Sequence, residues 1–108
     1  MRRGELYRMH NPPGDPKLHR TFVIVSRQWL IESRLSTLIC APVFSRGQGL
    51  ATQVSVGIDE GMKHESWILC DGLTSIRKAD LMQYVGFLSS SKLAEVDRAL
   101  VLALDLRF

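Results

Sequence analysis

The 108-residue chain has few of the features that disulfide-stabilised or membrane proteins need. Its only cysteines, Cys40 and Cys70, lie inside apolar runs at a spacing that matches no metal-binding or redox motif, so we expect two buried free thiols. No apolar run approaches the roughly 20 residues that a membrane helix needs. The polar start of the chain does not resemble a signal peptide. We therefore expect a cytoplasmic protein without membrane contact.

The sequence also lacks the spacing that metal and nucleotide sites require. Its three histidines, His10, His19 and His64, are scattered, and its acidic residues show no ligand pattern. The glycines within residues 46–49 lack the strand–loop–helix context of a phosphate-binding loop. We expect neither a metal ion nor another cofactor, and we assign His64 no role.

Charge is distributed unevenly along the chain. Residues 1–46 hold eight Lys or Arg and three Asp or Glu, a balance of +5, whereas residues 47–108 hold six and eight, a balance of −2. The basic half is therefore the expected face for an anionic partner, and nucleic acid is the commonest such partner. A solvated surface of mixed charge explains the same distribution equally well.

Short apolar segments dominate the pattern of the chain. Strands are predicted at residues 4–9, 21–26, 37–44, 53–57, 66–70, 73–76 and 84–88. Helical turns are predicted at residues 27–34, with Trp29, Leu30 and Ile31 packing inward, and at residues 78–81.

The clearest helix follows three consecutive serines, residues 89–91, whose hydroxyls can cap its first turn. Its apolar residues fall on one face at helical spacing: Leu93, Val96, Leu100, Ala103 and Leu104. Short strands without strand–helix alternation, closed by one helix, predict a mainly β (α+β) fold. We expect a single domain over residues 1–108, built as a small barrel or strongly curved antiparallel sheet with a C-terminal helix.

The junction of a loop with a strand carries the first candidate for a functional residue. Residues 10–19 contain three prolines and a glycine, which disfavour regular structure. A buried strand begins directly after Arg20. A charged side chain at this junction is held in place by the sheet and still reaches solvent. Many functional residues are positioned in this way.

Five segments occur in an order that is characteristic of one family. Residues 3–7 read Arg-Gly-acidic-apolar-aromatic, residues 19–26 form an arginine-led apolar strand, residues 39–43 end in Ala-Pro-apolar, residues 66–71 end in an acidic residue, and residues 88–100 form a closing helix. Together they cover the chain from about Arg3 to Leu104. In this order and spacing the chain resembles the MazF/PemK-type toxins of type II toxin–antitoxin systems, the mRNA interferase family.

The resemblance implies an SH3-like barrel that forms a homodimer. It implies an endoribonuclease that cleaves single-stranded RNA, mRNA above all, without metal. It further implies a cognate antitoxin whose acidic, partly disordered segment covers the RNA groove. Metal-free cleavage uses the 2′-hydroxyl of the RNA itself, which attacks the adjacent phosphorus and leaves 2′,3′-cyclic phosphate and 5′-hydroxyl ends.

The sequence departs from the family pattern at two positions. Thr21 replaces the proline that usually follows the strand arginine, and Phe44-Ser45 replaces the Thr-Ser pair after Ala-Pro-apolar. Ser45 supplies the missing hydroxyl only if the strand end is shifted by one residue, because successive side chains face opposite ways.

The candidate catalytic residues are Arg20 and Ser45. An arginine stabilises the charge that gathers on phosphoryl oxygens through its planar fork of donors, and a hydroxyl can hold phosphate. The expected RNA contacts are His19, Arg27, Phe44, Arg46 and Asp71. Simpler roles stay open: a solvated turn for Arg46, a core position for Phe44 and a turn cap for Asp71.

Two other functions remain open. The same barrel can be a nucleic-acid- or protein-binding module that no longer cuts, with Phe44 in place of the hydroxyl. A gyrase poison of the CcdB type has a similar fold but is expected to end Trp-Gly-Ile, whereas this chain ends Leu106-Arg107-Phe108. Because residues 37–44 and the closing helix are more apolar than a lone small barrel needs, we also expect a homodimer with one RNA groove across both subunits.

Overall fold

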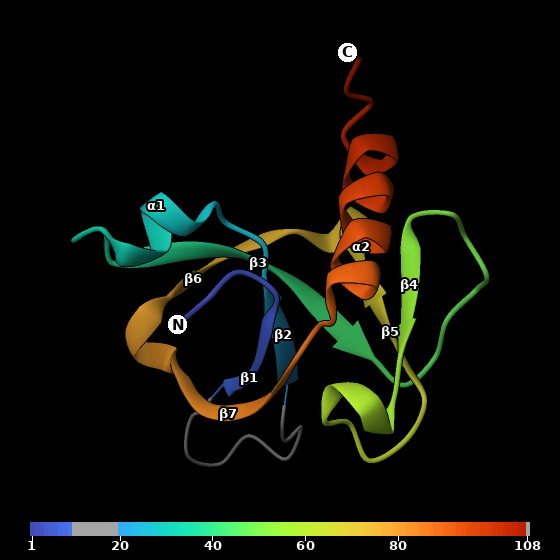
Figure 1. Ribbon diagram of the computed structural model, residues 1–108, viewed down its shortest axis with the longest axis horizontal. Helices are drawn as coiled ribbons and strands as arrows, with labels where there is room; N and C mark the ends of the chain where they lie inside the picture. The colour runs from blue at the N-terminus through green and yellow to red at the C-terminus, as the bar shows by residue number, and fades with distance from the viewer. Residues whose placement is uncertain (10–19, 108) are drawn as a thin grey trace.

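The computed structural model describes residues 1–9 and 20–107, and its strands form one antiparallel sheet (Figure 1). The seven strands are β1 (Glu5–Met9), β2 (Arg20–Ile24), β3 (Thr37–Phe44), β4 (Gln53–Val56), β5 (Ser66–Leu69), β6 (Thr74–Arg77) and β7 (Leu81–Phe87). Their order is β4-β5-β3-β2-β1-β7, and β6 pairs with β3 off this path. Each predicted strand is present, and the predicted loop at residues 10–19 lies outside the described residues.

The long strand β3 links the parts of the sheet because its two halves pair with different neighbours. Residues 37–40 pair with β6, and Val43 and Phe44 pair with β5. Within residues 1–9 and 20–107 no pairing joins the outer strands β4 and β7, so the curved sheet stays open (Figure 1). The expected mainly β fold, a strongly curved antiparallel sheet with a C-terminal helix, is confirmed in this open form.

Two hydrophobic clusters cover the two faces of the sheet, and β2 contributes to both. Val23 and Val25 belong to the first cluster, whereas Phe22 and Ile24 belong to the second. Alternate side chains of a strand point to opposite faces, so both faces of β2 are buried. This double burial explains why the strand is a continuous apolar run.

The two cysteines lie one in each cluster as buried free thiols, as predicted. Burial raises the pKa of Cys40 to about 12. Burial, with a smaller contribution from the Asp71 carboxylate, raises the pKa of Cys70 to about 11. Both thiols are therefore protonated at neutral pH and are poor nucleophiles.

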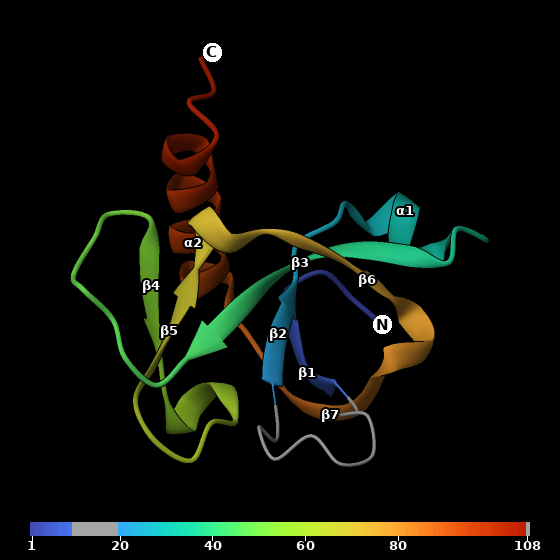
Figure 2. The same ribbon diagram turned by 180° about the vertical axis from the view of Figure 1, so that it is seen from behind.

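Helix α2 (Ser90–Ala103) stands against β4 and packs on the first cluster (Figures 1 and 2). It begins as predicted, because the Ser89 hydroxyl accepts a 3.2 Å hydrogen bond from the Lys92 amide. Val96 and Ala99 are its buried residues. The expectation that Leu104 completes this apolar face is wrong, because Leu104 lies at the helix end and is 52% exposed.

The short helix α1 (Gln28–Glu32) differs from the prediction in the residue that it buries. Ile31 packs into the second cluster, but Trp29 is 69% exposed. The Arg27 guanidinium lies 5.6 Å from the centre of the Trp29 ring, an arrangement that suits a cation–π contact at the surface. No helix in the described part of the chain is both long and apolar enough to cross a membrane.

The second predicted helical turn is shorter than expected. A 3₁₀ turn covers Lys78–Asp80, and β7 begins directly after it at Leu81. Leu81 pairs with Met9 of β1. Pairing with a neighbouring strand therefore overrides the local preference for a helix at this residue.

The segment between β4 and β5, residues 57–65, is fixed against β7 by two close backbone contacts. Gly61 has a φ of 94°, and a Cβ there would lie 2.2 Å from the Val85 carbonyl oxygen. A Cβ on Gly86 would lie 2.2 Å from the Glu60 carbonyl oxygen. Glycine alone fits at either position, so the segment is held in one place beside the sheet.

Candidate functional site

The ends of three neighbouring strands lie side by side at one end of the sheet and leave a groove there. β2 begins at Arg20 and β3 ends at Phe44, while β5 begins beside them. The pairs Thr21–Val43 and Val43–Ile68 hold these ends side by side. The cavity at these strand ends has a volume of about 530 Å³. We call it the strand-end groove, and its lining residues are Arg8, Arg20, Thr21, Val43, Phe44, Ser45, Met62, His64 and Ser66.

A smaller hollow of about 240 Å³ adjoins this groove, and we call it the side pocket. It is lined by Arg20, Thr21, Phe22, Pro42, Val43, Phe44, Gly72 and Thr74. Arg20 and Phe44 line both hollows. They flank the Thr21–Val43 pair on neighbouring strands, so they are cross-strand neighbours on one face of the sheet.

The strand-end groove is positively charged. Arg8 and Arg20 line it, and among the described residues no aspartate or glutamate does. Arg8 lies on β1 directly opposite Thr21, so the two arginines come from neighbouring strands. The hydroxyl of Ser45 and the ring of Phe44 complete the wall. Cations, a hydroxyl and an aromatic ring in one cavity can bind an anion that carries a planar group.

Three of the predicted site residues meet in this groove: Arg20, Phe44 and Ser45. Arg20 and Ser45 are exposed, and Phe44 is 49% exposed and so is not a core residue. Phe44 is the last residue of β3 and Ser45 follows it, so the alternation of side chains along the strand does not extend to Ser45, and both residues line the groove.

The other predicted RNA contacts lie away from the groove or outside the described residues. Arg27 stands beyond the far end of β2, over an aromatic ring, and Arg46 is exposed outside the residues that line the groove. Asp71 follows β5 and accepts a 2.6 Å hydrogen bond from the Thr52 hydroxyl, 19 residues away in sequence. His19 lies outside the described residues. Contact of these four with RNA stays a prediction.

Sequence reasoning missed two groove residues, Arg8 and His64. Arg8 reaches the groove through the register between β1 and β2, which the sequence pattern leaves open. His64 belongs to a polar connection in which no periodicity marks it. Its backbone is nevertheless well fixed, because its carbonyl accepts a 3.2 Å hydrogen bond from the buried Ser66 hydroxyl.

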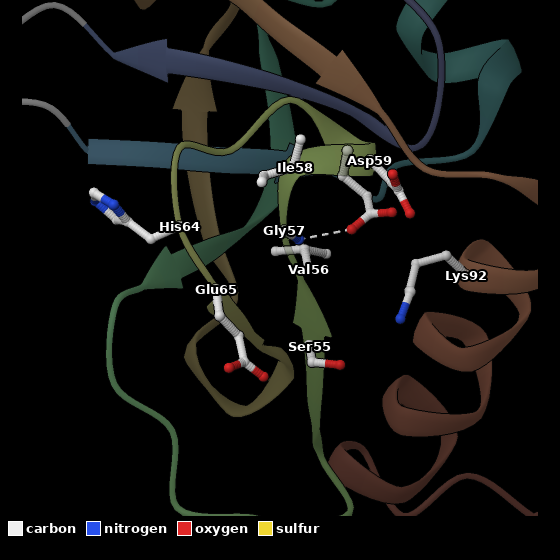
Figure 3. A pocket seen from close by; sticks show the side chains of 9 residues that line it. Ser55, Val56, Gly57, Ile58, Asp59, His64, Glu65 and Lys92 are labelled. Carbon is white, nitrogen blue, oxygen red and sulfur yellow. Dashed lines mark hydrogen bonds between the residues drawn. The ribbon is translucent and has the colours of Figure 1, made fainter.

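A third hollow, of about 430 Å³, meets the strand-end groove at His64 (Figure 3). We call it the acidic groove, and it is lined by Ser55, Val56, Gly57, Ile58, Asp59, Glu60, His64, Glu65 and Lys92. The Glu60 carboxylate accepts a 2.7 Å hydrogen bond from the Gly57 amide. Figure 3 shows the His64 imidazole pointing away from Asp59 and Lys92. Across residues 1–9 and 20–107, no three His, Cys, Asp or Glu side chains gather as metal ligands.

Comparisons with known proteins lead to one family. A family model described as a PemK-like, MazF-like toxin of type II toxin–antitoxin system matches residues 2–104. Endoribonuclease MazF3 of Mycobacterium tuberculosis is 30% identical over 87 residues, which are 81% of this chain and 84% of that protein. The resemblance carried by the five sequence segments is therefore confirmed.

Solved structures have the same fold. The Mycobacterium tuberculosis toxin MazF-mt6 superposes with a TM-score of 0.83 at 25% identity, covering 96% of this chain and 99% of that one. A mycobacterial endoribonuclease in complex with its cognate antitoxin superposes with a TM-score of 0.85 at 18% identity, over 100% and 98% of the two chains, and supports the fold alone. The chain belongs to the family of PemK-like, MazF-like toxins of type II toxin–antitoxin systems.

Proposed function

We propose that this chain, an endoribonuclease toxin by its family, cleaves single-stranded RNA, mRNA above all, in the strand-end groove and without a metal ion. The observation that carries the proposal is the meeting of Arg8, Arg20, Phe44 and Ser45 in a cavity that no carboxylate of the described residues lines. Such a cavity attracts the phosphodiester backbone and repels no part of it.

The reaction uses the 2′-hydroxyl of the RNA as its nucleophile. When this hydroxyl loses its proton, its oxygen bonds to the adjacent phosphorus, the bond between phosphorus and the 5′-oxygen breaks, and the 5′-oxygen takes up a proton. Negative charge gathers on the phosphoryl oxygens in the transition state. The guanidinium of Arg20 can donate two parallel hydrogen bonds to these oxygens and so stabilise that charge.

Ser45 and Phe44 take complementary parts in this proposal. The Ser45 hydroxyl lines the groove with Arg20 and can donate a further hydrogen bond to phosphate. Phe44, 49% exposed at the border of the groove and the side pocket, offers a ring on which a base can stack. Base stacking on an aromatic side chain is worth about 1–3 kcal/mol and tolerates any base.

The same groove is the proposed point of inhibition by a cognate antitoxin. A family of type II toxins implies such a partner. An acidic segment of the antitoxin would bring carboxylates to Arg8 and Arg20 and would cover the RNA site. Toxin and RNA are proposed to meet in the cytoplasm.

We also propose a homodimer whose RNA groove extends across both subunits. Leucines in and just beyond the last turn of α2 support it, because Leu102, Leu104 and Leu106 are 58%, 52% and 46% exposed. Large exposed apolar side chains are candidates for burial by a second subunit. Sedimentation at micromolar concentration tests this proposal, and a monomer there would contradict it.

The test of the activity is incubation of the purified protein with a long single-stranded RNA in EDTA. We expect discrete fragments with 5′ ends that a polynucleotide kinase labels directly and 3′ ends that carry cyclic phosphate. RNA that is bound but stays intact would support the non-cutting module instead, which Phe44 in place of the family threonine favours. RNA that is neither cut nor bound would overturn both functions.

A further inference from the structure

We infer that His64 is a catalytic residue, the general base that takes the proton from the 2′-hydroxyl of the RNA. The inference rests on the proposed function and adds a role that this function requires. His64 lines the strand-end groove together with Arg8, Arg20 and Ser45. It comes from the segment between β4 and β5, far in sequence from Arg20 and Ser45.

The other polar side chains of the groove are poorly suited to accept this proton. A guanidinium stays protonated in proteins, so Arg8 and Arg20 serve as charge-stabilising donors. The hydroxyl of Ser45 is a weak base. Imidazole is the side chain that ordinarily exchanges protons near neutral pH. Among the described lining residues, His64 therefore supplies the chemistry that the arginines and the hydroxyl lack.

The backbone around His64 is fixed on both sides, as a proton-transfer group requires. On one side Met62 packs against the first cluster, and Gly61 lies in close backbone contact with β7. On the other side the Ser66 hydroxyl, buried at the start of β5, donates a 3.2 Å hydrogen bond to the His64 carbonyl. The side chain itself stays exposed to the groove.

The charged side chains around His64 belong to the two grooves that meet at this residue. On one side Arg8 and Arg20 share the strand-end groove with it. The charged side chains on its other side are those of the acidic groove: Asp59, Glu60, Glu65 and Lys92. The imidazole points away from Asp59 and Lys92 (Figure 3), and Glu60 is engaged by the Gly57 amide. No salt bridge of the described residues involves the imidazole, which leaves its ring nitrogens available to a ligand in the groove.

In the inferred step the imidazole nitrogen accepts the proton of the 2′-hydroxyl as the 2′-oxygen bonds to phosphorus. The bond between phosphorus and the 5′-oxygen breaks, and the 5′-oxygen takes a proton from water in the open groove. The hydroxide that remains takes the proton from the imidazolium. The base is thereby restored, and the products are the cyclic phosphate and the 5′-hydroxyl.

The test compares single-turnover cleavage by the wild-type chain and by His64→Gln in EDTA, from about pH 5 to about pH 8. We expect His64→Gln to lower the rate by roughly 10²- to 10⁴-fold and to abolish the rise of the wild-type rate with pH. Binding of an RNA that carries 2′-deoxyribose at the cleaved position should stay unchanged. Lys63→Gln is the matched control, because Lys63 is an exposed neighbour outside the three lining sets, and it should retain the wild-type rate.

A second variant separates chemistry from folding. His64→Ala leaves space in the groove, and added imidazole should restore part of its lost activity. A loss that imidazole does not restore, together with a lowered unfolding midpoint, would assign His64 a structural role and overturn the inference.

Three further outcomes of these experiments distinguish a failure of the proposed function from a failure of the role assigned to His64. A wild-type chain that leaves RNA intact overturns the proposed function itself. A wild-type chain that cuts RNA, with an equal rate and pH profile in His64→Gln, overturns the role of His64 alone. A rise with pH that persists in His64→Gln but disappears in His19→Gln assigns the base to His19 and overturns the assignment to His64.

Discussion

The strand-end groove and the acidic groove meet at His64 but carry opposite charge. Arg8 and Arg20 line the first, whereas three carboxylates and Lys92 line the second. Their volumes, about 530 and 430 Å³, are similar. An RNA backbone is drawn to the first and repelled by the second, because it carries one negative charge per phosphate. Charge, and not volume, therefore distinguishes the proposed RNA site from its neighbour.

The two grooves also differ in how the backbone forms them. Paired strand ends build most of the strand-end groove, so its walls depend on the hydrogen-bonded ladder. The acidic groove is built largely by residues 55–65, whose position depends on the contacts of Gly61 and Gly86. Substitutions in the strand-end groove should therefore lower the rate of RNA cleavage, whereas substitutions that disturb the backbone of the acidic groove should lower the stability of the fold.

Arg20→Ala should produce the largest effect on activity. Removing a preorganised donor from a developing anion typically costs about 10²- to 10³-fold in rate. Arg20→Lys should recover only part of the loss, because an ammonium cannot form the bidentate fork. The measurement is the single-turnover cleavage rate in EDTA. Arg98→Ala is the control, since Arg98 is exposed on α2 outside the three hollows, and equal losses in both variants would contradict a special role for Arg20.

Gly86→Ala should destabilise the fold by about 1–3 kcal/mol, as overpacking usually does. The added Cβ would lie 2.2 Å from the Glu60 carbonyl oxygen, so the 57–65 segment must shift. The free energy of unfolding from urea titration measures the effect. Gly57→Ala is the matched control, because Gly57 has an extended φ of −159° and no atom within 4 Å of an added Cβ. Equal stability of the two variants would show that the close contact does not fix the segment.

Phe44→Ala should weaken RNA binding by about 1 kcal/mol or somewhat more, the value of one stacked base. The fold should lose little stability because the ring is already 49% exposed. Ile58→Ala removes an 80% exposed side chain from the acidic groove and should leave RNA affinity unchanged. Fluorescence anisotropy with an uncleavable oligonucleotide measures both affinities. A larger loss of affinity in Ile58→Ala than in Phe44→Ala would indicate that RNA binds in the acidic groove instead.

Exchanging single charges should give the smallest effects and opposite signs in the two grooves. Arg8→Gln should weaken RNA binding and make the salt dependence less steep by about one unit of log–log slope. Glu65→Gln should strengthen binding by a few tenths of a kcal/mol, because an exposed charge is well screened. Titrations at several salt concentrations measure both, and a strengthening in Arg8→Gln would reverse the assignment of the grooves.

The sequence predicts those parts of the fold that local patterns determine. The apolar run of β2 and the serine-capped helix α2 are examples, because burial and capping leave marks within a few residues. The place of Arg20 at the start of β2 is predictable for the same reason, since prolines and a glycine precede the apolar run in the sequence. The exposure of Trp29 is not predictable in this way. Of the three residues of α1 predicted to pack inward, only Ile31 is buried, and the local sequence does not reveal which one it is.

The groove itself is only partly predictable. Arg8 enters it through the register of β1 against β2, and His64 enters through the packing of a polar segment against β7. Both depend on contacts between residues far apart in sequence, which hydrophobic periodicity does not record. Ser45 and Phe44 line the groove together because β3 ends at Phe44, and the sequence pattern does not fix the residue at which strand alternation stops.

The most direct test of the central claim is a crystal structure of the chain with a short RNA whose 2′-hydroxyl is replaced by hydrogen at the cleaved position. We expect a phosphate within hydrogen-bond distance of the Arg20 guanidinium, and the 2′-carbon of the preceding ribose facing His64. An oligonucleotide that lies along the acidic groove, or one that leaves Arg20 free of phosphate, would contradict the assignment of the strand-end groove as the site of RNA cleavage.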